Sequence, residues 1–188
     1  MKKSIYFVLM LLVSMAMAGC MKENCGCEPK TDPPVLFQYE YYNYAWGFRH
    51  FGFMIDGEGR ANGFRQPKNW TAPDSMGMIS RSDLEYNLYQ CDTVYTRIDR
   101  SKLNQHYSKV EDIRSGKIID YGMVMADAGT GELSAWYWNR KAGKYENVFL
   151  MSNGDIYRVN SHPDVKEMVE YLKEIGKKTN NFYWYDGK

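Results

Sequence analysis

Glycine-containing turns at short intervals constrain the second half of this chain more than any other feature. Four apolar-rich runs, at 118–127, 132–139, 144–151 and 155–160, are separated by Gly129-Thr130-Gly131, Lys141-Ala142-Gly143 and Asn153-Gly154. Short glycine turns of this kind connect neighbouring antiparallel strands. We therefore expect the four runs to form an antiparallel meander.

The first half adds two strand regions. Residues 35–46 begin with an alternating pattern rich in aromatic side chains, which predicts a strand that is partly buried on both faces. Residues 51–65 contain two arms around Gly57 and Gly59, which indicates a hairpin. Together with the meander, these segments predict an antiparallel sheet of about six strands.

Helices are expected after the first hairpin and near the end of the chain. Ser80-Arg81-Ser82-Asp83 matches a capping box, with Leu84, Leu88 and Cys91 on one face of the helix that follows. A second helix is expected at 99–115. The last one is capped at 161–164, ends at Gly176 and has one apolar stripe, formed by Val165, Met168, Val169, Leu172 and Ile175. This order predicts an α+β fold in which the C-terminal helix packs on the sheet, with the aromatic tail Phe182–Tyr185 docked as a short edge strand.

The first twenty residues have the three parts of a signal peptide. Lys2 and Lys3 precede an apolar run at 5–13, which is too short to span a bilayer and is followed by small residues up to Gly19. Met17-Ala18-Gly19-Cys20 resembles the lipobox of bacterial lipoproteins, with Met17 where Leu is usual. The resemblance implies cleavage before Cys20 and diacylglycerol on its thiol. An ordinary secretory peptide cleaved after Ala18 or Gly19 is the alternative.

Three regions follow from this interpretation. Residues 1–19 are a removed signal peptide, 20–34 are a lipidated N-terminus and polar tether, and 35–188 form a single globular domain. The predicted location is a bacterial membrane reached through the N-terminal lipid. The outer membrane is favoured because position 21 is Met rather than the Asp that retains some lipoproteins at an inner membrane.

Charge and composition restrict the partners. Removal of residues 1–19 takes away two lysines and leaves 22 basic against 23 acidic side chains, which disfavours nucleic-acid binding. The 16 Tyr, 8 Phe and 5 Trp residues favour sheet and half-wet surfaces. Three cysteines remain besides Cys20, and Cys91 is expected to pair with Cys25 or Cys27. The cysteine spacing does not indicate a metal site or a cofactor.

No catalytic residue is predicted. The chain lacks a nucleophile elbow, and with 23 acidic side chains the sequence singles out no carboxylate pair. Its three histidines, His50, His106 and His162, lack metal-binding spacing and are expected at the surface or at a helix cap. Asp127, Gly129 and Glu132 are better explained by a hairpin turn than by a calcium loop.

The best binding candidates are Trp136 and Trp138, which lie two residues apart on a predicted strand and therefore share a face. An exposed face would stack sugar rings or peptide side chains, whereas a face covered by the 165–175 helix would be core. The leading hypothesis is a non-catalytic module of the cell envelope that binds a glycan, peptide or partner protein. A small envelope hydrolase with a site assembled only by the fold, and a structural subunit of an envelope assembly, are the alternatives.

Overall fold

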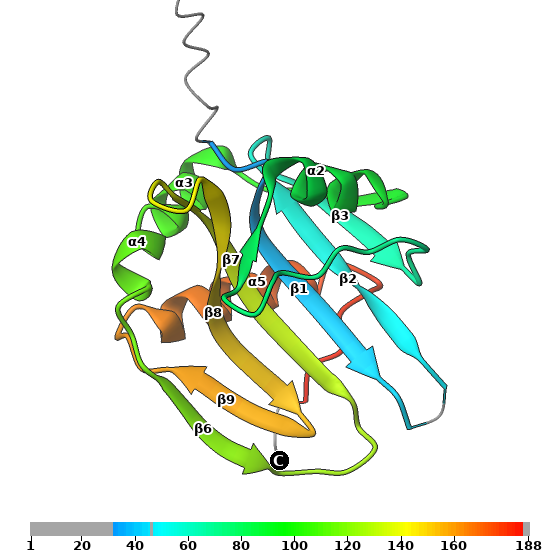
Figure 1. Cartoon of the computed structure of the whole chain (residues 1–188). Coiled ribbons are helices and arrows are strands. Elements are labelled where there is room, and N and C mark those ends of the chain that lie inside the picture. Colours follow the sequence, from blue (N-terminus) through cyan, green and yellow to red (C-terminus); the bar gives the residue numbers. More distant parts are fainter. Residues whose placement is uncertain (1–31, 46, 186–188) are drawn as a thin grey trace, which may run out of the picture. The chain divides into compact units, whose positions relative to one another are not determined.

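The computed structural model describes residues 32–45 and 47–185, and it has an α+β fold built on a large antiparallel sheet (Figure 1). This part of the chain contains nine strands, more than the six expected. The strands are β1 (Val35–Asn43), β2 (Arg49–Asp56), β3 (Arg60–Arg65), β4 (Met78–Ile79), β5 (Thr93–Arg97), β6 (Ile118–Met123), β7 (Thr130–Asn139), β8 (Lys144–Gly154) and β9 (Ile156–Asn160). The helices are α2 (Arg81–Tyr89), α3 (Arg100–Tyr107), α4 (Val110–Ile113) and α5 (Val165–Gly176).

The strands lie in the order β5-β3-β2-β1-β7-β8-β9-β6, and β4 pairs with β8 off this path. The expected meander is therefore wrong in one step, because β6 pairs with β9 and not with β7. Both edges of β7 are already occupied, by β1 along Phe37↔Ala135 to Tyr42↔Thr130 and by β8. Strands β7, β8 and β9 do form a meander.

The segment between the hairpin and β6 differs from the expectation in two ways. β5 is an additional strand that pairs with β3, and its five residues are mostly exposed, so they give no alternating pattern. The helix expected at 99–115 is divided at Ser108 and Lys109 into α3 and α4. The division lets Leu103, Val110 and Ile113 all reach the core, where each is fully buried.

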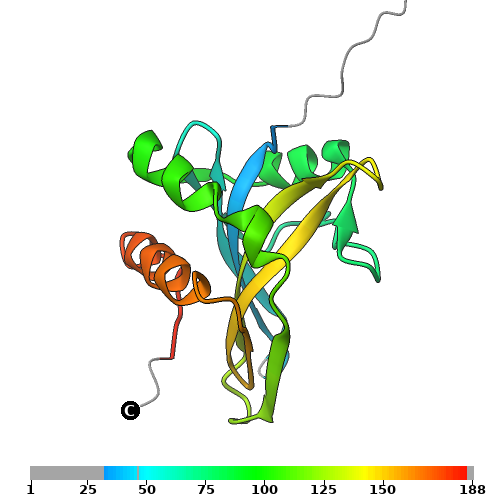
Figure 2. The same ribbon diagram turned by 90° about the vertical axis from the view of Figure 1, so that its left-hand side faces the viewer.

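Helices cover the two faces of the sheet unequally. Helices α3, α4 and α5 lie on one face, and α2 with the segment 66–79 lies on the other (Figures 1 and 2). Each face has its own hydrophobic cluster, one including Phe37, Tyr39 and Leu172 and the other including Met54 and Trp136. All five residues of the predicted α5 stripe are buried, which confirms that this helix packs on the sheet.

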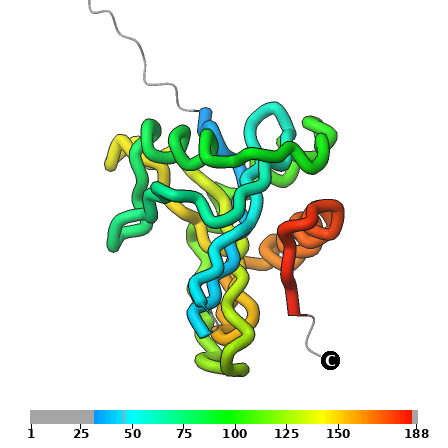
Figure 3. Tube along the Cα trace, turned by 90° about the vertical axis from the view of Figure 1, so that its right-hand side faces the viewer, coloured from blue at the N-terminus to red at the C-terminus, as the bar shows by residue number. Residues whose placement is uncertain are grey.

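The C-terminal tail is docked, but not as the expected edge strand. After α5 the chain turns back along the sheet (Figure 3), and Phe182–Tyr185 has no strand assignment. The Tyr39 hydroxyl donates to the carbonyl of Tyr183 and accepts from its N–H, and the Phe182 and Trp184 rings pack against Tyr39. The tail is therefore held on a face of the sheet by side chains, and it does not add a strand to an edge.

Replacing Leu172 by Ala tests this packing. Leu172 is fully buried between α5 and the sheet, so the truncation should lower the free energy of unfolding by about 2–5 kcal/mol. Lys166→Ala, on the exposed face of the same helix, is the control and should change it by less than about 0.5 kcal/mol. Urea unfolding of residues 20–188 measures both, and equal effects would contradict the packing described.

Candidate functional site

The face of the sheet that carries α2 also carries a row of charged side chains. In Figure 1, α2 and the segment 66–79 lie over the upper part of this face, and no described helix covers its lower part. Glu40 on β1 lies directly opposite Glu132 on β7, which lies opposite Ser152 on β8, which in turn lies opposite Arg158 on β9. Cross-strand neighbours share a face of a sheet, so these side chains gather on one surface.

His50 on β2 extends this row at its other end. Its Nε2 lies 3.3 Å from Oε1 of Glu40, and Nη2 of Arg158 lies 3.3 Å from Oε2 of Glu132. We call His50, Glu40, Glu132 and Arg158 the charged row. Each carboxylate thus has one basic partner, and the two carboxylates meet in the middle of the row.

The environment raises the pKa of Glu132 and of the neighbouring Tyr42 hydroxyl. Burial, together with the neighbouring Glu40 carboxylate, raises the pKa of Glu132 to about 7, although Arg158 opposes the shift. Burial also raises the pKa of the Tyr42 hydroxyl, and its hydrogen bond to Glu40 adds to this effect. Glu132 therefore exchanges a proton near neutral pH, which an ordinary surface carboxyl does not do.

Aromatic rings surround the His50 end of the charged row. The His50 ring stacks on Tyr42 with centroids 4.4 Å apart and meets Trp70 edge-on at 5.1 Å. Beyond Tyr42, the rings of Tyr44 and Phe48 lie 5.3 Å apart and are 74% and 51% exposed. We call Tyr42, Tyr44 and Phe48 the aromatic rim. The charged row thus lies next to the exposed rings of the aromatic rim.

The two tryptophans predicted to bind a ligand lie elsewhere on the same face. Trp136 is 1% exposed, and its indole N–H donates to Oε1 of Gln38 at 2.9 Å. Trp138 is half-buried against Tyr145, with ring centroids 5.0 Å apart. Both rings belong to the hydrophobic cluster beneath α2. The helix expected to cover them, α5, packs on the opposite face, and ligand binding by these two residues stays a prediction.

The histidines have three different environments. His50 is 3% exposed, so the expectation of a surface or capping position is wrong for it, because Trp70 and Phe64 pack against its ring. The Nδ1 of His162 accepts from the N–H of Asp164, the N-cap residue of α5, and this helix has no side-chain capping hydrogen bond, so the expected capping role is wrong for His162. His106 stacks on Tyr171 with centroids 3.8 Å apart.

The cysteine predictions are largely outside the part of the chain that the structure describes. Cys91 is a free, half-buried thiol, and burial beside Asp92 raises its pKa to about 12. Cys25, Cys27 and the lipid-bearing Cys20 lie outside the described residues, so lipidation and disulfide pairing stay predictions. Among residues 32–45 and 47–185, no three His, Cys, Asp or Glu side chains are grouped so that they could hold a metal ion.

Comparison with known proteins does not assign a family. No protein-family model, no curated protein and no solved structure gives a significant match to the chain. Within the described residues, no helix has both the length and the apolar character needed to cross a membrane. The charged row and the aromatic rim are therefore interpreted from their geometry alone.

The raised pKa of Glu132 predicts how stability depends on pH. Since the pKa rises from the ordinary 4.5 to about 7 on folding, the contribution of this group is fully present below pH 4.5 and is lost as the pH rises through 7. Glu132→Gln, which cannot ionise, should therefore stabilise the protein at pH 8 relative to the native chain. We expect about 1 kcal/mol, because the side chain is a third exposed and solvent screens the charge.

Urea unfolding of both proteins between pH 4 and pH 8 measures this difference. The stability gained by Glu132→Gln should grow between about pH 4.5 and 7 and level off above that range. The control is Glu58→Gln, in the exposed turn between β2 and β3. A gain that does not change with pH would show that Glu132 titrates as an ordinary carboxyl.

Proposed function

We propose that this protein is a non-catalytic, lipid-anchored binding module of the cell envelope, and that the charged row with its aromatic rim is its site for a glycan. The observation that carries the proposal is that the Arg158–Glu132 ion pair and the His50–Glu40 contact lie on a partly covered sheet face, next to exposed aromatic rings. Sugar hydroxyls donate and accept hydrogen bonds, and the row offers carboxylate acceptors and a guanidinium donor. Exposed rings such as those of Tyr44 and Phe48 stack on the apolar faces of sugars.

Folding alone does not account for this arrangement. Like charges directly opposite one another on neighbouring strands destabilise a sheet, and Glu40 lies directly opposite Glu132. The same positions in the upper part of this face are occupied by Gln38 and Ser134, which are neutral and buried. A costly charge arrangement beside a stable core is typical of residues kept for binding or chemistry.

The proposed location in the cell envelope depends on the N-terminal segment. The lipobox resemblance of residues 17–20 supports export and attachment to the outer membrane, and the polar residues 21–34 would hold the domain away from the lipid. A glycan ligand suits this address because envelope polysaccharides and cell-wall fragments are the polymers present there.

Fluorescence titration of residues 20–188 with a panel of polysaccharides and cell-wall fragments tests glycan binding. Trp70 packs against His50, so its emission should shift in a saturable way when the charged row is occupied. Phe48→Ala should weaken binding about tenfold, since it removes one stacking ring. Tyr89→Ala, which removes an exposed ring from α2, away from the charged row, is the matched control. Equal affinities for both variants, or a silent panel, would count against the proposal.

The Glu132 carboxyl also favours the hydrolase hypothesis as a second candidate. Glycosidases pair a protonated carboxyl, which gives a proton to the leaving oxygen, with a carboxylate that activates the attacking water or attacks directly. Glu132, with a pKa of about 7, would be the acid, and Glu40 opposite it would be the carboxylate.

Release of reducing ends from the same panel separates the two candidates. A hydrolase should release products from the native chain and lose at least a hundredfold of that rate in Glu132→Gln, since general acid catalysis contributes about that much or more. Glu58→Gln should keep the native rate. Binding without products, or equal product release by the native chain and Glu132→Gln, would eliminate this mechanism and leave the binding module.

A further inference from the structure

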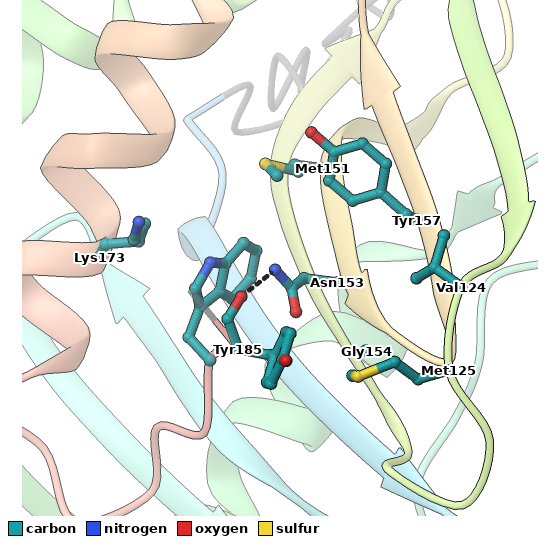
Figure 4. Close-up of a pocket in the computed structure, with 9 residues that line it drawn as sticks. Val124, Met125, Met151, Asn153, Gly154, Tyr157, Lys173 and Tyr185 are labelled. Carbon is teal, nitrogen blue, oxygen red and sulfur yellow. Dashed lines mark hydrogen bonds between the residues drawn. The ribbon is translucent and has the colours of Figure 1, made fainter. Parts of the chain in front are cut away.

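The opposite face of the sheet contains a cavity that is separate from the charged row. It has a volume of about 510 Å³ and lies between the C-terminal tail and the ends of β8 and β9 (Figure 4). Met151 lies opposite Leu133, a residue of the cluster beneath α5, whereas Ser152 belongs to the other face. A volume of this size falls within the range of 300–1,000 Å³ that is typical of small-molecule sites.

The walls of this tail cavity combine apolar and aromatic groups with polar ones, among them the side chains of Asn153 and Lys173. Met125 and Met151 contribute thioethers, and Tyr157, Trp184 and Tyr185 contribute rings. Figure 4 shows Met125, Met151, Tyr157 and Tyr185 around one space, together with Asn153 and Lys173. Methionine side chains adapt to irregular ligands and make favourable contacts with aromatic rings. The lining therefore suits a flat aromatic molecule that also carries a polar group.

Among the described residues, one buried polar atom of the cavity lining has no partner. The Nδ2 of Asn153 donates to the carbonyl of Tyr185, which leaves its Oδ1 as the acceptor. That Oδ1 is buried and accepts no hydrogen bond from any described residue. A buried acceptor without a partner is unfavourable, and a ligand N–H or O–H that reaches it removes this penalty.

We propose that the tail cavity binds an aromatic small molecule of the indole or phenol class, whose N–H or O–H donates to Oδ1 of Asn153. The ring lies between the two methionines and the tail aromatics. This site does not depend on the glycan site, because the two lie on opposite faces of the sheet and share no residue.

Calorimetric titration of residues 20–188 with indole and p-cresol tests the proposal. Both should bind saturably, and N-methylindole, which has no donor, should bind about tenfold more weakly because Oδ1 stays without a partner. Val124 lines the cavity and is 53% exposed, so Val124→Trp should block the cavity without disturbing the core and should weaken indole binding at least tenfold. Ile119→Trp, on exposed β6 but outside the cavity lining, should leave it unchanged.

Three results would overturn the proposal. These are no heat with millimolar indole or p-cresol, equal affinities for indole and N-methylindole, and equal effects of Val124→Trp and Ile119→Trp. Phe48→Ala, at the aromatic rim, should leave indole binding unchanged, so failure of the glycan site and failure of the tail cavity are distinguishable.

Discussion

The structure depends on the pairing of β1 with β2 on one side and with β7 on the other. This single strand joins the N-terminal hairpin to the C-terminal meander, although β1 and β7 are far apart in sequence. Successive side chains of β1 point to opposite faces of the sheet, so the sequence of β1 determines which residues each face receives. Phe37 and Tyr39 turn toward α5, and Tyr39 also anchors the tail, whereas Gln38 and Glu40 turn toward the face that α2 covers only in part. One register therefore creates a hydrophobic core on one face and positions the charged row on the other.

The two faces differ in what they do for the protein. On the α5 face, aromatic rings and the apolar helix stripe are buried, and their burial stabilises the fold. On the other face, the carboxyl groups of Glu40 and Glu132 lie opposite one another, and each has only one basic partner. This arrangement stabilises the sheet less than a pair of apolar side chains at the same two positions would. The aromatic rim lies next to that charge. One face thus stabilises the fold, whereas the charges on the other face reduce its stability. This difference is the physical reason to assign function to Glu40 and Glu132.

Elements that depend on a few neighbouring residues were predicted from the sequence. The α5 stripe, the Ser80 cap on Asp83 and the glycine turns that follow β7 and β8 are each encoded within a few residues, and the structure confirms them. The hairpin turn expected at 129–131 is wrong, because Thr130 and Gly131 lie within β7 and the preceding strand, β6, pairs with β9. The features that sequence reasoning missed depend on distant segments. β6 was expected next to β7 because nothing local shows that β1 takes that edge, and β5 has no alternating pattern. The charged row could not be predicted because Glu40 and Glu132 become neighbours only through the β1–β7 register. His50 is buried because Phe64 and Trp70, which follow it in the sequence by more than ten residues, pack against its ring.

The most direct test of the charged row as a binding site is chemical-shift mapping of isotope-labelled residues 20–188, titrated with the glycans that shift tryptophan emission. The account predicts that the largest changes fall on Glu40, Glu132, Arg158 and the aromatic rim, and that α5 is little affected. Changes concentrated on α5 and the tail, or no changes with any glycan of the panel, would contradict it.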